Sequence, residues 1–338
     1  MLTGAIIGFG QVVEHGHIPA FSERKENFSI KAVADADPER RRRALELLPA
    51  ARVYSSHEEL FAKESGLEFA DIATPPAMHP GHVAAALEKG LHVLCEKPLA
   101  LTIGEFDAIR EQAEAAGKCV FTIHNWKKAA PMLKVWELLR TGFAGSIHHA
   151  EFHTLRQQPA SSALSVKSWR QNPSLSGGGI LVDHGWHAFY LLCAMTGQDP
   201  VSVTARLGFP HAGQEAVDDT AACWVDFPSC TGLVCLSWRS PCRKNIGFIH
   251  GTSGLIEIRD GDVIKEARDA QAETISTGDP LTAGSAHPAW MTPTLDDFLD
   301  EVNDPYKRGK NLREAQFCIK LITGSVRSHS MGARTVPI

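Results

Sequence analysis

The first third of the chain alternates short apolar runs with longer segments of helical periodicity. The apolar runs predict buried strands at Gly4–Ile7, Phe28–Ala34, Glu68–Thr74, His92–Glu96 and Cys119–Ile123. Strands separated by helical segments of about 10–15 residues are typical of βαβ units, which form a parallel sheet with right-handed crossovers. We therefore expect an α/β domain at the N-terminal end.

Helix start and stop signals divide the same region. Asp37 precedes Pro38 and predicts the start of a helix that runs through Leu48. Ser56 to Glu59 and Thr102 to Glu105 have the pattern of capping boxes, and Gly90 is placed to end a helix.

After about His124 the apolar runs follow one another with turn residues between them. They predict strands at Ile147–His153, Val201–Leu207, Thr220–Phe227, Gly232–Trp238, Ile246–His250 and Leu255–Ile258, with helices at Met132–Arg140, His184–Met195 and Leu312–Ser328. This pattern is typical of a mostly antiparallel sheet. Gln157–Ser176, rich in Ser, Gln and Pro, is expected to be an exposed loop.

The 338 residues are more than one globular core normally needs, so two domains are expected. The pattern of apolar runs changes after about His124, so we expect the first domain at residues 1–124 and the second at residues 125–338.

The composition excludes several classes of protein. The net charge is -5 and 43% of residues are hydrophobic, as in folded soluble proteins. The longest basic run, Arg40 to Arg43, is flanked by Glu39 and Glu46 and predicts a solvated helix face. Nucleic acid and membranes are therefore not expected as partners. Eight scattered cysteines without a CxxC pair, and the absence of a secretion signal, predict a cytoplasmic protein with reduced thiols.

A glycine turn follows the first predicted strand. Gly8, Phe9 and Gly10 precede a helical segment that begins near Gln11 and Val12. Such a turn lets the backbone approach a pyrophosphate closely, and the helix N-terminus offers free N–H groups. The third position of the GxGxxG pattern is Val13, a departure from the usual small residue.

An acidic residue, Asp35, ends the second predicted strand. A carboxylate there can accept hydrogen bonds from an adenosine ribose, so strand, glycine turn, helix, strand and acid together predict a dinucleotide site. Asp35 and Asp37 would repel a 2′-phosphate and favour NAD over NADP. An arginine from the run at 40–43 reaching a phosphate is the alternative.

Several stretches resemble one family along nearly the whole chain. They read GFGQVVEHGHIPAF, AVADADPER, ATPPAMHPGHVAAALEKGLHVLCEKPLALT, SWRQNPSLSGGGILVDHGWHAFYLL and NLREAQFCIKLITGSVRSHSMG. The chain resembles the glucose–fructose oxidoreductase / inositol dehydrogenase (Gfo/Idh/MocA) family. This resemblance implies an N-terminal NAD-binding Rossmann domain. It also implies a C-terminal α+β domain for substrate binding, whose mostly antiparallel open sheet forms a homodimer or homotetramer.

The resemblance also implies the catalytic residues. Lys97, in Glu96-Lys97-Pro98 at the end of a predicted parallel strand, would point at the reacting hydroxyl, and the proline that follows it often has a cis peptide bond. His187 would act as the acid/base, and Asp183, four residues earlier, would orient it or bind substrate. On one helix this spacing puts both on one face. An N-cap aspartate with a core histidine is the alternative.

The remaining candidates come from the same resemblance. The expected cofactor contacts beyond the glycine turn and Asp35 are Thr74, Pro75, His79, Glu96 and Lys97. The expected substrate contacts are His124, Asn125, Lys127, Trp169 and Arg170. His17, in the HIPAF stretch, is assigned to packing.

The sequence thus predicts hydride transfer between NAD and a secondary alcohol of a sugar, polyol or cyclitol. The sequence has 16 histidines, but no metal is expected, because His148, His149, His184 and His187 lack a known ligand spacing such as HExxH. Two alternatives remain: an NAD-using glycosidase with no net redox change, and a non-catalytic regulator that senses sugar or NAD.

Overall fold

The computed structural model describes residues 1–159, 169–210, 217–284 and 286–338. The chain forms two compact units. The first contains Met1–Asn125 and Gly284–Ala315, and the second contains Trp126–Ala283 and Gln316–Ile338.

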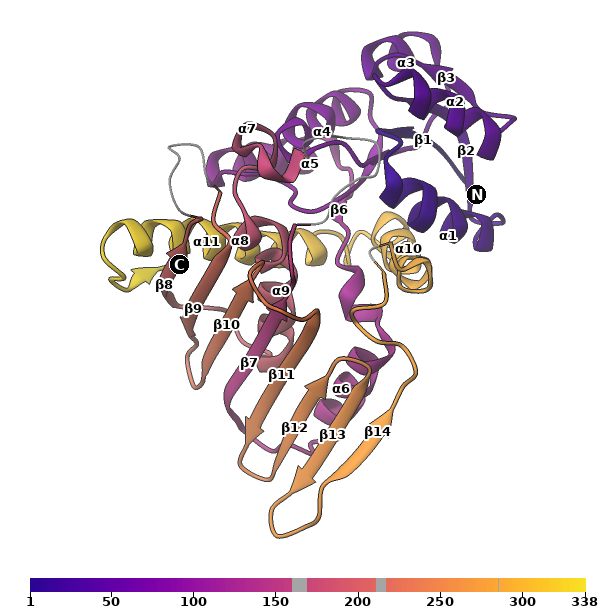
Figure 1. The fold of residues 1–338 in the computed structure, drawn as a ribbon. Helices are drawn as coiled ribbons and strands as arrows, with labels where there is room; N and C mark the ends of the chain where they lie inside the picture. The colour runs from indigo at the N-terminus through magenta and orange to yellow at the C-terminus, as the bar shows by residue number, and fades with distance from the viewer. Residues whose placement is uncertain (160–168, 211–216, 285) are drawn as a thin grey trace. The chain divides into compact units, whose positions relative to one another are not determined.

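A six-stranded parallel sheet forms the centre of the first unit (Figure 1). Its strands lie in the order β3-β2-β1-β4-β5-β6, and every neighbouring pair is parallel. The bounds are β1 Leu2–Ile7, β2 Phe28–Ala34, β3 Arg52–Tyr54, β4 Phe69–Ile72, β5 His92–Cys95 and β6 Val120–Thr122. This confirms the predicted α/β domain. The additional strand β3 has only three residues, too few for a periodic signal.

The predicted caps Asp37, Ser56 and Thr102 each begin a helix of this unit, and Gly90 follows the end of another. They are α1 Ile18–Glu23, α2 Pro38–Leu47, α3 His57–Lys63, α4 His79–Glu88, α5 Ile103–Ala116 and α10 Pro288–Asn303, with short turns η1 Val13–His17 and η2 Pro76–Met78. Asp37 and Ser56 cap α2 and α3 through their side chains. Thr102 and Glu105 form a complete capping box at α5.

Residues 284–315 belong to the first unit, although the change of rhythm at residue 124 assigned them to the second domain. Helix α10 supplies the reason, because its Phe298 is fully buried against the aromatic core. The Phe298 ring centroid lies 5.9 Å from Phe69 and 5.9 Å from Phe121. Asn311 also binds the sheet, where its amide accepts from the Thr122 N–H and donates to the Thr122 carbonyl oxygen.

A nine-stranded sheet forms the second unit, in the order β14-β13-β12-β11-β7-β10-β9-β8-β15. The bounds are β7 Ile147–Leu155, β8 Ser202–Gly208, β9 Thr220–Asp226, β10 Thr231–Ser237, β11 Lys244–Gly251, β12 Gly254–Arg259, β13 Asp262–Ala267, β14 Glu273–Ser276 and β15 Val336–Pro337. Among the described strands of this sheet, only β7 and β10 pair in parallel. This confirms the predicted α+β domain with a mostly antiparallel sheet.

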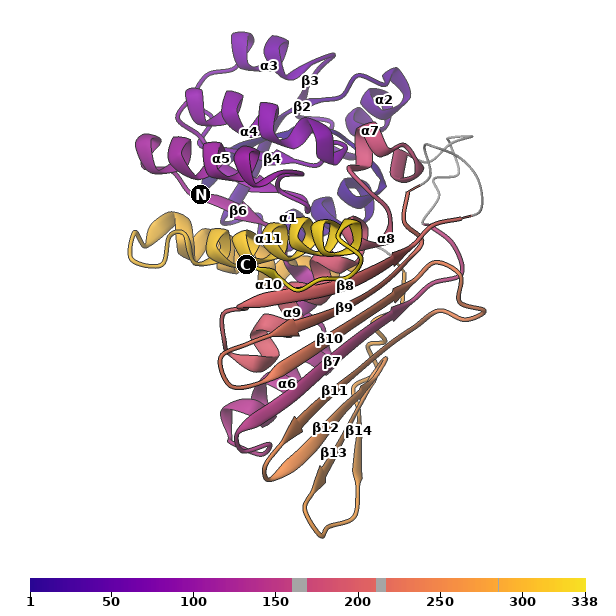
Figure 2. The same ribbon diagram turned by 90° about the vertical axis from the view of Figure 1, so that its left-hand side faces the viewer.

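Helices cover one face of this sheet. Helices α6 (Ala130–Arg140) and α9 (Gly185–Thr196) lie on it, and the opposite face carries no helix in the part of the chain that the structure describes (Figures 1 and 2). Helix α11, Lys310–Ser330, divides between the units at residue 315. No helix among the described residues is long and apolar enough to cross a membrane.

The segment expected to be an exposed loop, 157–176, is only partly described. Residues 160–168 lie outside the described residues. Trp169–Gln171 forms a single helical turn, η4, and Pro173–Ser176 forms the short helix α7. Asn172 caps α7 by accepting the Ser174 N–H, which explains why a Ser- and Pro-rich segment is helical there.

Candidate functional site

The glycine turn closes the carboxyl end of β1. Gly8 has φ 89°, and a Cβ there would lie 2.9 Å from the backbone of Ala73, so the fold itself requires glycine. Gly10 differs, because a Cβ at this position would meet no protein atom within 4 Å. An open space next to a helix N-terminus suits a phosphate group. Val13, the departure from the glycine pattern, is fully buried and begins the π-helical turn η1.

Asp35 holds the backbone of this turn. Its Oδ2 accepts the Phe9 N–H at 2.6 Å, and its Oδ1 accepts the Asp37 N–H at 2.8 Å. The Phe9 side chain is fully buried in the core, so only its backbone faces the turn. Gln11 is exposed and Val12 half-buried at the start of the helix.

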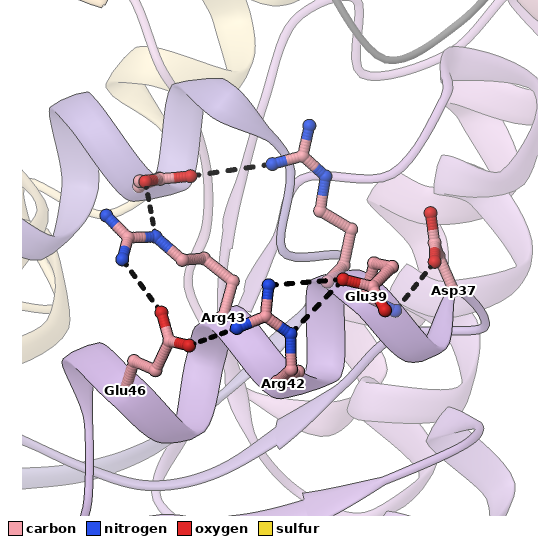
Figure 3. Close-up of polar contacts among 7 residues, drawn as sticks. Asp37, Glu39, Arg42, Arg43 and Glu46 are labelled. Carbon is pink, nitrogen blue, oxygen red and sulfur yellow. Dashed lines mark hydrogen bonds and ion pairs between the residues drawn. The ribbon is translucent and has the colours of Figure 1, made fainter.

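The arginine run on α2 is engaged by acidic side chains. Arg43 lies 2.9 Å from Glu46, and Arg42 pairs with Glu39 and Glu46 on the same helix (Figure 3). Glu14 binds Arg40 at 3.4 Å and Arg43 at 2.7 Å.

Arg41 donates to the carbonyl oxygens of Asp35 and Ala36. Each guanidinium of the run therefore already has an acceptor from the protein.

Two further loops meet at the neighbouring carboxyl ends of β4 and β5. The Lys97–Pro98 peptide bond is cis. His79, at the start of α4, is fully buried, and its ring nitrogens each lie 2.7 Å from a carbonyl oxygen, of Pro98 and of Thr74. Burial lowers the pKa of His79. This ring ties the loop containing Thr74 and Pro75 to the turn containing Lys97, so its nitrogens are used inside the protein.

Glu96 and His17 meet beneath this turn. Glu96 accepts the Lys97 N–H through Oε2 at 3.1 Å, and its Oε1 lies 3.2 Å from His17 Nε2. His17 was assigned to packing from the sequence. It is buried as expected, but both of its ring nitrogens contact carboxylates.

The end of β6 carries the next candidates. His124 is buried, and its Nδ1 lies 3.1 Å from Glu314 Oε2. Asn125 is half-buried and begins the turn η3, Asn125–Lys128.

In the second unit, His187 stands on α9 within an aromatic cluster. Its ring stacks on Trp126, with centroids 4.4 Å apart and planes 12° apart. Its Nδ1 lies 2.8 Å from the Tyr190 hydroxyl, which also accepts the Trp126 N–H at 3.2 Å. A hydrogen bond at one ring nitrogen fixes the orientation of the other. The cluster therefore holds the histidine in one position.

Asp183 does not share a continuous helix with His187. It ends the short helix α8 (Ile180–Asp183), and His184 separates this helix from α9. The continuous helix assumed by the four-residue spacing is therefore interrupted at one residue, and the shared face of Asp183 and His187 stays a prediction. Asp183 lies 3.5 Å from Arg170 Nε and 3.3 Å from His184 Nδ1.

Arg170 and Lys127 are the remaining candidates of this unit. The Arg170 guanidinium lies 4.4 Å from the centre of the Trp169 ring. The Lys127 carbonyl oxygen accepts from the Trp136 indole.

Asp218 holds the start of α8, and the sequence analysis missed it. Its carboxylate accepts the N–H groups of Gly179 and Leu181, at 2.7 and 2.8 Å. A Cβ on Gly179 would collide with the Asp218 carbonyl oxygen, so the triple glycine allows this close approach.

Tyr190, Trp126 and Glu314 were also missed. In the sequence, Tyr190 and Trp126 have the pattern of apolar core residues. Tyr190 contacts Trp126, and Glu314 contacts His124, across long distances in sequence. Among the described residues, no group of three or more His, Cys, Asp and Glu side chains is arranged to hold a metal ion.

Two family profiles match the chain. Residues 2–124 match the Gfo/Idh/MocA oxidoreductase family, NAD-binding Rossmann fold, and residues 132–257 match the Gfo/Idh/MocA C-terminal domain. Trans-1,2-dihydrobenzene-1,2-diol dehydrogenase of Xenopus laevis is 31% identical over 68% of this chain and 66% of its own length. D-glucoside 3-dehydrogenase of Escherichia coli (strain K12) is 28% identical over 56% of this chain and 54% of its own length.

A levoglucosan dehydrogenase solved with NADH has the same fold, with a TM-score of 0.87, 20% identity, and coverage of 100% of this chain and 99% of that one. Among curated relatives the chain spans about half to two thirds of their length. The two profile matches together cover most of the chain, in the order that the two units require. The chain belongs to the Gfo/Idh/MocA oxidoreductase family, and residues 2–124 form its NAD-binding Rossmann domain.

Proposed function

We propose that this protein transfers a hydride between NAD and a secondary alcohol of a sugar, polyol or cyclitol. One observation carries the proposal: the carboxyl ends of adjacent strands place the open space at Gly10, Asp35 and the Lys97 turn along one edge of the parallel sheet. Ligands of open α/β sheets bind at this edge. When bound, NAD supplies the hydride acceptor.

The residues present fit this cofactor. The turn from Gly8 to Val12 would hold the pyrophosphate at the helix N-terminus. Asp35 would accept hydrogen bonds from the hydroxyl groups of the adenosine ribose. The loop containing Thr74 and Pro75, together with Glu96, would lie along the nicotinamide ribose. His79 supports this loop from within, through its contact with the Thr74 carbonyl oxygen.

Replacing Gly10 with alanine should weaken NAD binding without destabilising the free protein. The added methyl group meets no protein atom, so it would occupy space that the pyrophosphate needs. Overpacking of about 1–3 kcal/mol corresponds to a loss of roughly fivefold to 150-fold in affinity. Calorimetric titration with NAD and thermal unfolding of the free protein measure the two effects.

Gly8→Ala is the matched control. Its positive φ and the contact with Ala73 predict a lower unfolding temperature before any cofactor is added. Unchanged NAD affinity in Gly10→Ala would place the pyrophosphate elsewhere.

We expect NAD to bind more tightly than NADP, because Asp35 is acidic and the arginines of α2 are already engaged. Asp35→Asn removes the charge and keeps an oxygen acceptor for one of the two backbone N–H groups, that of Phe9 or that of Asp37. The ratio of NADP to NAD dissociation constants should then fall by about tenfold or more, because the like-charge repulsion is lost. A ratio that stays constant would mean that Asp35 does not face the ribose. Asp107→Asn, at a half-buried position on α5 where the carboxylate pairs with Arg110, is the control.

The proposal gives three residues roles in the reaction. Lys97 would stabilise and orient the reacting oxygen, and His187 would take the hydroxyl proton during oxidation and return it during reduction. Asp183 would support His187 or bind a substrate hydroxyl. Tyr190 is added as the residue that orients the His187 ring through Nδ1.

The substrate class is inferred from polar groups and from the names of relatives. His124, Asn125, Lys127, Trp169 and Arg170 include hydrogen-bond donors and an aromatic ring, which suit a compound rich in hydroxyl groups. The relatives named above are dehydrogenases of a cyclic diol and of a glucoside.

The uncovered face of the nine-stranded sheet supports homo-oligomerisation. Trp224 is 41% exposed on β9, and Leu233 on β10 and Phe248 on β11 are half-buried. Apolar side chains on a sheet face without helices are typical of a subunit interface. We propose a homodimer or homotetramer formed through this face, which light scattering of the purified protein would test.

Incubation with NAD and a panel of sugars, polyols and inositols, read by NADH formation, tests the function. Sustained NADH formation with one class of alcohol is the expected result. Release of sugar from a glycoside without NADH accumulation would favour the glycosidase alternative. A protein that binds NAD and sugar but converts no member of the panel would favour the regulator.

A further inference from the structure

Three ionisable side chains form a chain beneath the turn that carries Lys97: His17 and Asp71 are buried, and the Glu96 side chain is 14% exposed. His17 Nδ1 lies 2.8 Å from Asp71 Oδ2, and His17 Nε2 lies 3.2 Å from Glu96 Oε1. His17 is 1% exposed and Asp71 is fully buried. The other oxygen of Glu96 accepts the backbone N–H of Lys97 at 3.1 Å. Contacts therefore run from the interior of the sheet to the backbone of Lys97.

The local fold is built around this arrangement. His17 is the last residue of the π-helical turn η1, where the Ile18 N–H bonds to the Val13 carbonyl oxygen. π-Helical turns are rare in proteins overall, but those that occur are often found at functional sites. Asp71 interrupts an otherwise apolar strand, β4, in which every residue is buried. Burying a carboxylate is costly unless it is paired, and packing alone gives no reason for one here.

The charges of the three groups depend on one another. Burial by itself would lower the pKa of His17, but the charge and hydrogen bond of Asp71, and then those of Glu96, raise this pKa to about 10. Burial by itself would raise the pKa of Glu96, but His17 and then Lys97 lower it below its ordinary value. At neutral pH, His17 is therefore a cation that keeps Glu96 ionised.

The other titratable groups near Glu96 do not take the place of His17 between the Glu96 carboxylate and the sheet. Burial raises the pKa of the Cys95 thiol, so it stays neutral. Burial lowers the pKa of His79, and both of its ring nitrogens contact backbone carbonyl oxygens rather than the Glu96 carboxylate. Lys97 itself follows Glu96 in the turn. His17 is thus the side chain that links the Glu96 carboxylate to Asp71 in the sheet.

We propose that His17 is a positioning residue: its ring joins Asp71 to Glu96 and fixes the Glu96 carboxylate against the backbone N–H of Lys97. This inference rests on the role of Lys97 in the proposed function. Without His17, two carboxylates would remain buried together, and one would bind a proton at neutral pH. A Glu96 that is protonated, or that repels Asp71, would no longer hold the Lys97 backbone in one position.

Removing and then compensating the charge tests the proposal. In His17→Gln, NAD-dependent turnover should fall by about tenfold or more, because small displacements of a positioned group are costly to catalysis. The loss should grow as pH rises, since the second buried carboxylate then ionises. In the double variant His17→Gln with Asp71→Asn, only Glu96 remains charged, so turnover should partly recover and its additional pH dependence should vanish. His92→Gln, at the amino end of β5, is the control.

A packing role makes the opposite prediction. Two substitutions in one buried cluster should then lower turnover further than one, and the pH profile of His17→Gln should match that of the wild-type protein. Either result would overturn the proposal.

Unfolding of the free protein tests the same point without turnover. In His17→Gln, one carboxyl should have a higher pKa in the folded protein than in the unfolded chain, so the folded protein keeps a proton that the unfolded chain has released. The free energy of unfolding should therefore fall as pH rises from the ordinary carboxyl pKa to the raised one. Adding Asp71→Asn to His17→Gln leaves a single carboxylate, so this loss of stability with rising pH should disappear. If the wild-type protein oxidises no alcohol, the proposed function fails while this test of the charge arrangement still stands.

Asp71→Asn alone provides a second test should His17→Gln not fold. Histidine nitrogen NMR of the wild-type protein should show the His17 ring protonated well above neutral pH. In Asp71→Asn the same resonance should titrate at lower pH, because the largest favourable contribution is gone. A His17 ring that is neutral at pH 7 in the wild-type protein would contradict the proposal.

Discussion

Lys97→Met should lower turnover by about a hundredfold to a thousandfold while leaving NAD affinity nearly unchanged. Methionine keeps an unbranched side chain of similar length and removes the ammonium group. If Lys97 stabilises the oxygen whose charge changes during hydride transfer, the loss falls on the chemical step, and donors of this kind contribute that much. The backbone N–H that Glu96 accepts is retained, so the turn itself should persist.

Single-turnover formation of NADH separates this effect from binding. Calorimetry with NAD and thermal unfolding should give wild-type values, and Lys89→Met, at the exposed end of α4, should behave as the wild-type protein. Turnover of Lys97→Met within a few fold of wild type would exclude the lysine from the reaction.

His187→Asn should reduce turnover by about a hundredfold to ten-thousandfold, the usual contribution of a positioned acid/base. An asparagine amide can occupy the position of Nδ1 and keep the contact with the Tyr190 hydroxyl. It removes the Nε2 end of the ring, where we propose that the substrate proton is transferred. The pH dependence that an ionising histidine gives to turnover should disappear as well.

Tyr190→Phe separates orientation from proton transfer. This variant keeps the imidazole and its stacking on Trp126, so it should lose less activity than His187→Asn and keep a histidine-type pH profile. An unchanged pH profile in His187→Asn would show that another group accepts the proton. Loss of the fold, seen by thermal unfolding, would instead support the alternative in which His187 is a core residue.

Combining Lys97→Met with His187→Asn shows whether the two residues act on the same step. Residues that act as a unit have non-additive effects, so the double variant should be hardly slower than the slower single variant. Multiplied losses would mean that they contribute to separate steps.

The sequence predicted the parallel sheet well because fully buried strands are continuous apolar runs between clear helix caps. It did not place α10 with the first unit. This helix contains Pro293 and mixes Thr and Asp with its apolar residues, and its packing on Phe69 and Phe121 is a long-range contact. Strands β13 and β14 were not predicted, because they carry mixed polar residues and lie at the edge of the second sheet.

The candidate site was predicted in part for a similar reason. Positions at strand ends follow from the order of strands and turns, which places Gly8, Asp35 and Lys97 correctly. The break at His184 could not be predicted from the four-residue spacing, which assumes one continuous helix.

Pairs of side chains from different helices and strands could not be predicted from the sequence either. Whether the arginines of α2 could bind a 2′-phosphate depends on Glu14, which lies on a different helix. His17 looked like a packing residue because its partners, Asp71 and Glu96, lie on β4 and after β5. Only the buried carboxylate within the apolar run of β4 hinted at an ionic role.

Transfer of deuterium from the alcohol carbon to the nicotinamide tests the central claim most directly. The protein would be incubated with NAD and carbon-perdeuterated glucose, sorbitol and inositol, and the reduced cofactor analysed by mass spectrometry. The account predicts deuterated NADH with at least one class of alcohol, and its loss in Lys97→Met. Unlabelled NAD after complete incubation with every class, by a folded protein that binds the cofactor, would contradict it.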